Sequence, residues 1–168
     1  MRTNYITGNA YGGPSVTAAG MAFGIAVDGV IDFGGSITKL TGVRSGDGIS
    51  PSAYFNYYFF KQGINRMPLS AAINVSYASY EGNKAYSAGL LVSRNVRITC
   101  CTFVQPTFGG AVTTSEFRAE DIWGHFQIAV PVCFAVQPKL TIVISPSASF
   151  SQVEPAYSIG LGLVIKKP

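Results

Sequence analysis

The residues that could perform chemistry in this 168-residue chain are few, and the first is its single histidine. His125 lies two residues after Trp123, and the one carboxylate well inside another patterned segment is Asp32, far away in sequence. A histidine that acts as a general base needs an activating partner within hydrogen-bond reach. Nothing in the sequence brings Asp32 to His125, so we interpret His125 as an interior polar residue paired with Gln105 or with water. The sequence therefore predicts no enzymatic activity.

The three cysteines give no metal or cofactor site. None of them has the Cys-x-x-Cys spacing, and one histidine adds little to a ligand set. Cys100 and Cys101 are adjacent and point to opposite faces of an extended chain, so at most one can join Cys133. If the loop at Thr114–Ile122 is symmetric, Cys101 lies diagonal to Cys133 and a disulfide between them could form. Three small buried apolar side chains are an equally good interpretation.

The elements that hold these residues are indicated by where the charges are absent. Only 12% of the residues are charged, against about 25% in a soluble domain, and nearly all of them fall in short turn-like segments. Between the turns, stretches of roughly 10–15 residues alternate apolar with small polar side chains, which predicts strands. No run approaches the roughly 18 apolar residues of a membrane helix.

Nine strands are clear from the alternation, and all of them belong to one domain that spans residues 1–168. Asp28-Gly29 supplies the φ > 0 pair of a two-residue type I′ hairpin between the first two strands. The strands are Val16–Val27, the segment from Ile31 to Thr38, Pro51–Phe60, Pro68–Tyr80, Ala85–Ser93, Ile98–Thr113, Trp123–Phe134, Lys139–Ser151 and Tyr157–Lys166. Pro106, Pro131 and Pro146 lie inside these strands and predict bulges or earlier strand ends.

The volume of the two strand faces decides their orientation. Some forty large apolar side chains do not fit inside a barrel of eight to ten strands, so the apolar face meets lipid and the small polar face lines a lumen. The polar lumen-lining residues are Asp32, Ser36, Tyr54, Asn56, Tyr58, Asn74, Gln105, His125 and Gln127.

Backbone groups in lipid must all be paired, so the sheet has to close. An even strand number with both termini on the periplasmic side requires a further strand within Thr3–Ala10, with Tyr11–Ser15 as the first loop. The prediction is an all-β, closed antiparallel up-and-down transmembrane β-barrel of ten strands, with eight as the alternative. The turns at Asp28-Gly29, Lys61–Met67, Arg94–Arg97 and Ala135–Pro138 form the inner end, and the loops at the other end, which are longer on average, are external.

Charge is divided unequally between the two ends. The predicted basic inner rim consists of Lys61, Arg66, Arg94, Arg97, Lys139, Lys166 and Lys167, whereas acidic residues prevail at the outer end. The rim is either a set of solvated turns or a docking surface for an acidic periplasmic or envelope protein or for anionic headgroups. Lysines at turn tips lack the interleaved aromatic residues of a nucleic-acid surface, so no nucleic-acid partner is expected.

The segment Ser158-Ile159-Gly160-Leu161-Gly162-Leu163-Val164-Ile165 is similar to the C-terminal insertion signal of small outer-membrane β-barrels, although the chain ends Lys166-Lys167-Pro168 and not on Phe or Trp. With the strand pattern, this resembles the group that contains the OmpA-type transmembrane domain and the opacity-type surface proteins. The resemblance implies the bacterial outer membrane, with its lipopolysaccharide, after removal of a signal peptide.

The expected role is a non-catalytic structural anchor, a surface-exposed module or a subunit of an envelope assembly. The alternative is a narrow diffusion pore for small solutes. A soluble ligand-binding barrel and a lipid-modifying barrel enzyme are further alternatives.

Overall fold

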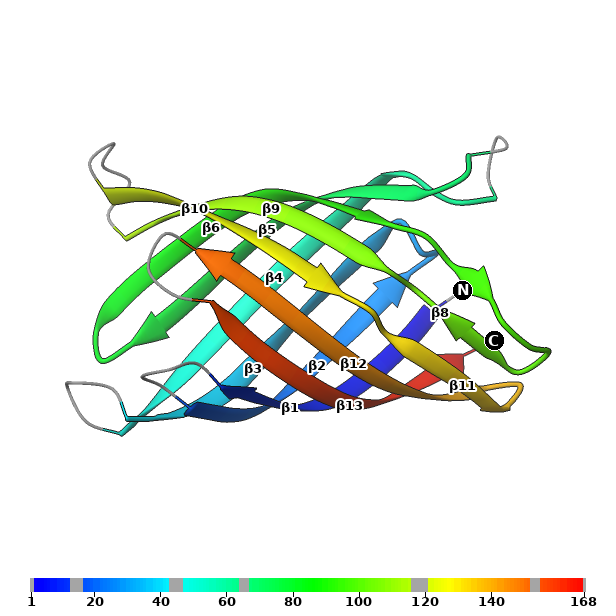
Figure 1. Ribbon diagram of the computed structural model, residues 1–168, viewed down its shortest axis with the longest axis horizontal. Coiled ribbons are helices and arrows are strands. Elements are labelled where there is room, and N and C mark those ends of the chain that lie inside the picture. Colours follow the sequence, from blue (N-terminus) through cyan, green and yellow to red (C-terminus); the bar gives the residue numbers. More distant parts are fainter. Residues whose placement is uncertain are drawn as a thin grey trace.

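The computed structural model describes residues 2–12, 17–42, 47–63, 67–115, 121–151 and 155–167, without the side chains of Arg2, Tyr11 and Lys167. These residues form thirteen strands of one antiparallel sheet (Figure 1). In chain order they are β1 (Arg2–Gly12), β2 (Thr17–Val27), β3 (Ile31–Thr41), β4 (Gly48–Phe60), β5 (Ser70–Tyr80), β6 (Asn83–Ser93), β7 (Val96–Arg97), β8 (Thr102–Val104), β9 (Thr107–Thr114), β10 (Ile122–Ala129), β11 (Val132–Gln137), β12 (Leu140–Ser151) and β13 (Ala156–Lys167). Among the described residues, no helix is long and apolar enough to cross a bilayer.

The sheet closes into a barrel of ten strands. Following the pairings from β1, the order is β1, β2, β3, β4, β5, β6, β9, β10, β12 and β13, and β13 pairs with β1 again. This confirms the predicted closed antiparallel barrel and its ten strands. The expected N-terminal strand is β1, and both termini lie at the same end of the barrel (Figure 1).

Three barrel strands are interrupted, and the interruptions coincide with two of the three prolines that the sequence placed inside strands. β7 continues β6, β9 continues β8 past Pro106, and β11 continues β10 past Pro131, each in an unchanged register. Pro146 stays inside β12, opposite Ile159. A proline cannot donate a ladder hydrogen bond, but its carbonyl still accepts one.

Those carbonyls keep the wall joined at the interruptions. The amides of Arg94, Gln105 and Val130 donate to the carbonyls of Pro106, Pro131 and Pro146 over 3.1, 2.9 and 3.0 Å. Pro131 has no N–H to donate to the carbonyl of Gln105. This carbonyl instead accepts a hydrogen bond from the hydroxyl of Thr107 at 3.0 Å. The prolines therefore remove donors from the ladder without opening the barrel.

The turn predicted at Arg94–Arg97 is wrong, because the chain turns later, at Ile98–Cys101. The polar pair Arg94-Asn95 lies at the interruption between β6 and β7, where the side chain of Gln62 forms hydrogen bonds with the backbone of Asn95. Gln62 Nε2 donates to the carbonyl of Asn95 at 2.9 Å, and the amide of Asn95 donates to Gln62 Oε1 at 2.5 Å. The result is a hairpin of β7 and β8 that extends the wall at the end that carries both termini (Figure 1).

Two tight turns rely on residues with positive φ. Asp28 and Gly29 have φ of 51° and 63°, and the amide of Val30 donates to the carbonyl of Val27 at 3.0 Å. The predicted φ > 0 pair is therefore confirmed, but the connection has three residues, because Val27 is paired with Ile31. Glu81 and Gly82, with φ of 48° and 84°, form a two-residue hairpin between β5 and β6.

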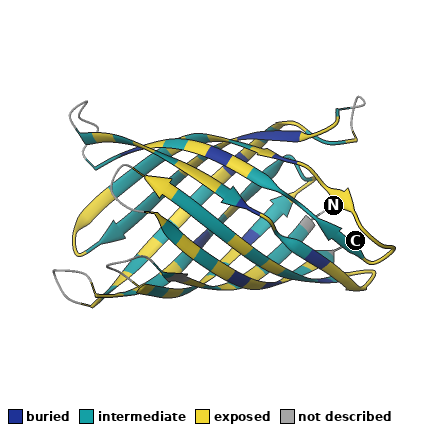
Figure 2. Cartoon of the chain, viewed as in Figure 1, coloured by how far each residue is buried: buried dark blue, intermediate teal, exposed yellow. Residues whose placement is uncertain are grey.

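The two faces of the wall differ as the alternation predicts (Figure 2). Outward-facing apolar side chains are strongly exposed, with Met21 at 67%, Phe23 at 61% and Leu161 at 63% of their full area. Inward-facing residues such as Ala72 and Thr141 are buried, at 0% and 5%. Large exposed apolar side chains around a closed sheet are typical of a wall that stands in lipid.

The lengths of the connections do not distinguish the two ends. At the end opposite the termini the connections have four, six, two, seven and four residues, and at the end of the termini three, nine, four and two. The loops expected to be external are therefore longer on average by only a small fraction of a residue, which is too little to indicate the orientation. The residues 13–16, 43–46, 116–120 and 152–154 lie outside the described part of the chain. All of them belong to the predicted external loops except Val16, the first residue of the predicted strand Val16–Val27.

Candidate functional site

The most connected group of polar side chains in the lumen surrounds Asp32. Tyr5 Oη donates to Asp32 Oδ1 at 2.6 Å, and Tyr54 Oη approaches the same oxygen at 3.4 Å. Asn56 Nδ2 donates to Asp32 Oδ2 at 3.3 Å, and Asn74 Nδ2 donates to Asn56 Oδ1 at 2.7 Å. The Asp32 cluster, as we call these five residues, links strands β1, β3, β4 and β5.

Glycine on the strand between β1 and β3 makes this cluster possible. Gly24 of β2 is paired with Gly34 of β3, and both face the lumen. A Cβ atom on Gly24 would collide with the ring of Tyr5 and with the hydroxyl groups of Tyr5 and Tyr54. Because that Cβ is absent, Tyr5 reaches across β2 to the carboxylate of Asp32.

Tyr5 was not among the predicted lumen residues. The sequence could have indicated it, because the alternation continued through Thr3–Ala10 places Tyr5 on the same face of the strand as the small polar residue Thr7. The other four members, Asp32, Tyr54, Asn56 and Asn74, were all predicted to face the lumen, and the structure brings them together.

The Asp32 cluster places one carboxylate in the lumen among neutral donors. Asp32 is half-buried and Asn56 is buried at 7% exposure. Burying a charge is costly unless it is hydrogen-bonded, and hydrogen bonds to a charged acceptor are stronger than neutral ones. The arrangement can attract a cation or orient a polar molecule by hydrogen bonds.

His125 belongs to a separate network. Its Nδ1 lies 3.3 Å from Thr113 Oγ1, and Thr113 Oγ1 lies 2.7 Å from Ser87 Oγ. Asp32 is bonded to residues of β1 and β4, so the structure does not bring the histidine and the carboxylate together. Among the described residues, no three His, Cys, Asp or Glu side chains gather as a metal site.

The predicted pairing of His125 with Gln105 is wrong. The register places His125 opposite Ala111, so Thr113 is its diagonal neighbour, whereas Gln105 lies beside Pro131 near the interruption of β10 and β11. The backbone of Gln105 bonds Pro131 and Thr107 there.

The other predicted lumen residues line the interior without joining one site. Ser36 Oγ lies 2.7 Å from Ser52 Oγ, and Tyr58 is half-buried on β4. Gln127 faces the lumen on β10 and is exposed. A small cavity of about 20 Å³ lies between Gln127 and Asn74.

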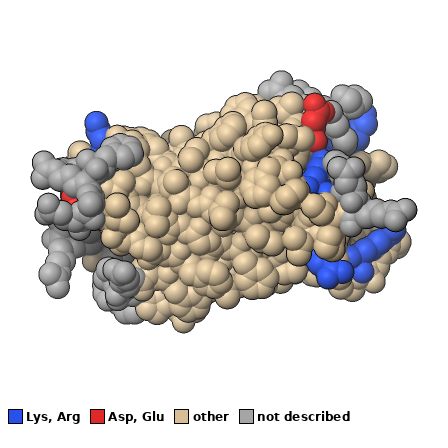
Figure 3. All heavy atoms as spheres, turned by 90° about the horizontal axis from the view of Figure 1, so that it is seen from above, with Lys and Arg blue, Asp and Glu red and all other residues tan. Residues whose placement is uncertain are grey.

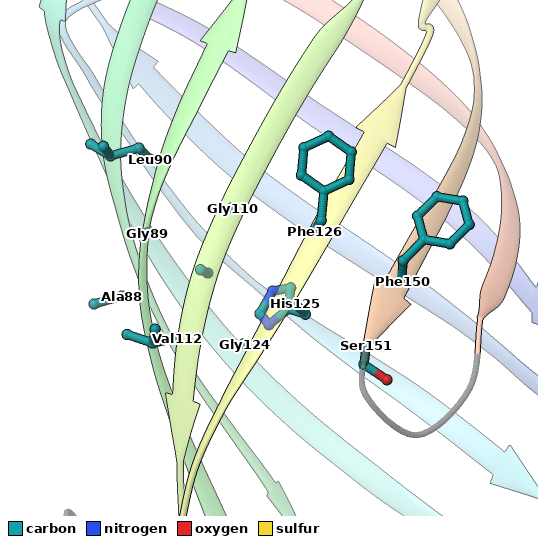
Figure 4. A pocket seen from close by; sticks show the side chains of 11 residues that line it. Ala88, Gly89, Leu90, Gly110, Val112, Gly124, His125, Phe126, Phe150 and Ser151 are labelled. Carbon is teal, nitrogen blue, oxygen red and sulfur yellow. The ribbon is translucent and has the colours of Figure 1, made fainter. Parts of the chain in front are cut away.

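The lipid-facing side of the wall near His125 carries a groove of about 640 Å³. Its floor includes Gly110 and Gly124, where an added Cβ would meet nothing within 4 Å. Figure 4 shows the rings of Phe126 and Phe150 projecting from the neighbouring strands β10 and β12 beside this floor. We refer to it below as the Gly110 groove.

Part of the predicted basic rim is occupied by local contacts. Lys61 Nζ donates to the carbonyl of Asp28 at 2.9 Å, and Arg97 donates to the carbonyls of Thr99 and Cys100 at 3.0 and 3.1 Å. Arg94 and Lys139 are exposed and Lys166 is half-buried. On the face drawn in Figure 3 the wall between the two ends carries no charge, and most of the blue atoms gather at the end of the termini. Arg66 and the side chain of Lys167 lie outside the described part of the chain.

The predicted disulfide between Cys101 and Cys133 is not formed, and all three cysteines are free thiols. The predicted diagonal relation is correct, since Cys133 is paired with Phe103. Diagonal neighbours are about 7–8 Å apart, however, and Cα atoms more than about 7 Å apart cannot be bridged without backbone movement. Cys133 is buried, whereas Cys100 and Cys101 are exposed with their sulfur atoms 3.2 Å apart, and this contact raises the pKa of the Cys101 thiol.

No protein-family model and no curated protein matches this sequence. Solved structures do share its fold. An outer membrane channel from Pseudomonas putida F1 aligns over 98% of this chain and 94% of its own with a TM-score of 0.57 and 6% identity. The translocator domain of the autotransporter NalP from Neisseria meningitidis aligns over 99% and 88% with a TM-score of 0.54 and 6% identity. KdgM porin, in a complex with disordered oligogalacturonate, aligns over 98% and 99% with a TM-score of 0.53 and 9% identity.

The fold is therefore that of the outer-membrane β-barrels. At 6–9% identity the likeness concerns the fold alone. These structures are a channel, a translocator and a porin, so the narrower resemblance to OmpA-type and opacity-type proteins stays a prediction.

Proposed function

We propose that this protein is a narrow pore for small polar solutes in the bacterial outer membrane. The observation that carries the proposal is the lack of a packed interior: within the described part of the chain, no large side chain is fully buried, and the buried apolar residues are three alanines and one cysteine. An eight-strand barrel is just wide enough for side chains to fill it. Ten strands enclose a wider interior, and small side chains such as Ala72 and Thr141 line it beside the tyrosines of the lumen, so we expect a passage that is narrow.

The character of the lumen supports polar solutes. The Asp32 cluster contributes a carboxylate, two phenols and two amides to one side of the interior. Gln127, on β10, presents an exposed amide inside the barrel. The channel and the porin among the structural neighbours agree with a pore.

The proposal is tested by conductance in planar bilayers. Purified protein is expected to give small, steady channels, and Gln127→Trp is expected to reduce their conductance because it places a large ring in the lumen. Phe126→Trp is the matched control, since it changes the adjacent residue on the lipid-facing side and should leave conductance unaltered. No channels from folded wild-type protein, or equal conductance in both variants, would contradict the pore.

A second candidate function is that of a structural subunit in an envelope assembly, as the sequence first suggested. The observation that favours it is the hairpin of β7 and β8, in which β7 lies at one edge of the sheet and, among the described strands, pairs with β8 alone. Arg94 and Lys139, exposed at the same end, would suit an acidic partner. Replacing both with Gln should release such a partner from complexes isolated at low salt, whereas Lys84→Gln at the opposite end should retain it.

Both candidates are non-catalytic. Thr113 is the side-chain partner of His125, and the network that contains them ends on the hydroxyl of Ser87 and includes no carboxylate. A soluble ligand-binding barrel would have to keep outer-wall residues such as Met21 and Phe23 in water, although both are more than 60% exposed.

A further inference from the structure

The lipid-facing wall holds a second and larger groove, away from the Gly110 groove. It has a volume of about 920 Å³ and crosses β13, β1, β2 and β3 in the half of the barrel opposite the termini. Its outward-facing lining residues are Gly8, Ala10, Ala19, Met21, Ile37, Lys39, Ile49, Ile144, Ile159 and Leu161. We call it the Lys39 groove.

The Lys39 groove has a low floor and high rims. Gly8, Ala10 and Ala19 form the floor, and an added Cβ on Gly8 would come no closer than 3.9 Å to another atom. The rims carry longer apolar side chains such as Met21 and Ile159, which are 67% and 58% exposed. A trough of this shape, in a wall that stands in lipid, can hold an acyl chain more closely than the convex wall around it.

One end of the trough is marked by a cation. Lys39 projects from the lipid-facing side of β3, two residues before the strand ends, and is paired with Ala19 and Ile49. Its side chain is exposed, and in the described residues no acidic side chain lines the groove. A lysine near the end of a membrane-spanning strand can extend its ammonium group to the headgroup level.

The Gly110 groove lacks this feature. It is also largely apolar and lies in the same wall, but among the described residues no Lys, Arg, Asp or Glu lines it. A groove without a charge can accept an acyl chain and has no means of selecting an anionic headgroup. The effect of Lys39 on lipid binding can therefore be judged by comparing the two grooves of the same protein.

We propose that the Lys39 groove binds one phosphorylated glycolipid of the external leaflet, with an acyl chain in the trough and a phosphate on the ammonium group of Lys39. Both termini lie at the opposite end of the barrel, which is the periplasmic end of single-chain barrels, so Lys39 faces the leaflet that carries these glycolipids. The site depends on the membrane position of the wall and is independent of conduction through the lumen.

Native mass spectrometry of the purified barrel with added lipid A tests the site. The measured quantity is the fraction of protein that carries one lipid molecule. One lysine near a membrane surface contributes about 1 kcal/mol to the attraction of anionic lipid, so Lys39→Gln should reduce binding about fivefold. Lys84→Gln, at the same end but outside the groove, is the matched control and should bind like the wild type.

Two further experiments distinguish the contribution of the headgroup to binding from that of the trough. Lipid A from which the phosphates have been removed should bind the wild type as weakly as intact lipid A binds Lys39→Gln. Ala19→Phe, which fills the floor without adding charge, should weaken the binding of both forms of lipid A. Equal losses in Lys39→Gln and Lys84→Gln, undiminished binding of the dephosphorylated form, or a Lys39-dependent preference for phosphatidylglycerol over lipid A would each overturn the proposal. Heat-modifiable migration of every variant confirms that it is folded.

Discussion

At the scale of single residues, Asp32 is the side chain on which the interior is organised. Among the described residues it is the one acidic side chain within a strand, next to the first residue of β3, and its two oxygens accept hydrogen bonds from a phenol at 2.6 Å and an amide at 3.3 Å. These bonds connect β3 to β1 across the glycines of β2 and to the neighbouring β4. The same carboxylate is therefore both a lumen charge and a tie between strands.

Replacing Asp32 with Ala should destabilise the barrel. The substitution leaves Tyr5 Oη and the buried Asn56 Nδ2 without their acceptor, and a buried donor that loses its partner costs about 1–3 kcal/mol. Urea unfolding in lipid vesicles measures the change in the free energy of unfolding. Ser36→Ala, which breaks one neutral bond to Ser52, is the control and should cost about 0.5–1.5 kcal/mol. A loss for Asp32→Ala no larger than that of the control would show that the cluster contributes little.

At the scale of elements, one property of the strands decides which surface meets lipid. Successive side chains point to opposite faces, so a residue and its neighbour in sequence experience hydrocarbon and lumen in turn. The exposed Phe23 of β2 and the adjacent Gly24 under the tyrosines illustrate the difference. Substitution by a charge should therefore be tolerated on alternate residues.

Phe23→Arg, near the middle of β2, is expected to cost about 2–4 kcal/mol in the free energy of unfolding, because it places a charge on the lipid face. Gln127→Arg, on the lumen face of β10, should cost much less, since Gln127 is exposed inside the barrel. Both values come from the same urea titration in vesicles. Equal costs for the two variants would mean that the faces have been assigned incorrectly.

The hairpin of β7 and β8 carries exposed apolar residues for a different reason than the barrel wall. Ile98, at its tip, is 60% exposed, close to the 61% of Phe23. The hairpin extends past the end of β5, so we expect its tip to lie in water. Ile98→Arg should then change the free energy of unfolding by no more than about 0.5 kcal/mol, as is usual at exposed sites. A cost comparable to that of Phe23→Arg would place the hairpin inside the hydrocarbon.

At the scale of the whole molecule, the two ends of the barrel differ in charge and the wall between them is apolar. Lys61, Arg94, Arg97 and Lys139 lie at the end of the termini, and Asp47, Glu81 and Asp121 lie at the other end with Lys84. The connections at the two ends have similar lengths, so we infer the orientation of the barrel in the membrane from the end at which the termini lie. If the termini lie on the periplasmic side, as in single-chain barrels, the basic end is inside.

Labelling in whole cells tests this orientation. In a variant that lacks the three native cysteines, a single Cys at Ser115 should react with an impermeant maleimide, because the connection from β9 to β10 is external in the proposed orientation. A single Cys at Lys139, in the turn between β11 and β12, should react only after the outer membrane is permeabilised. The reverse pattern would put the basic end outside and the Lys39 groove in the periplasmic leaflet.

Much of the fold could be predicted from the sequence because strand alternation is a local property. Nine of the ten barrel strands, their faces and lumen residues such as Asp32, Asn56 and Asn74 follow from side chains two residues apart, and the tenth strand follows from closure. The site could be predicted less well. Tyr5 was missed because the N-terminal strand was inferred from closure and its faces were not read, and the partner of His125 was assigned incorrectly because it depends on the register of β9 against β10.

By itself, then, the sequence determined a closed, lipid-facing barrel with a polar interior, since alternation and the placement of charge are enough to specify which surface each residue meets. Only the tertiary structure decided which polar residues meet one another. The contact of Tyr5 with Asp32 depends on β1 and β3 flanking Gly24, and the Lys39 groove combines residues of β13 and β1 with residues of β3. The first contact depends on the registers of β2 with β1 and with β3, and the groove also depends on the pairing of β1 with β13, which forms only when the sheet closes. Alternation along a single strand does not specify any of these registers.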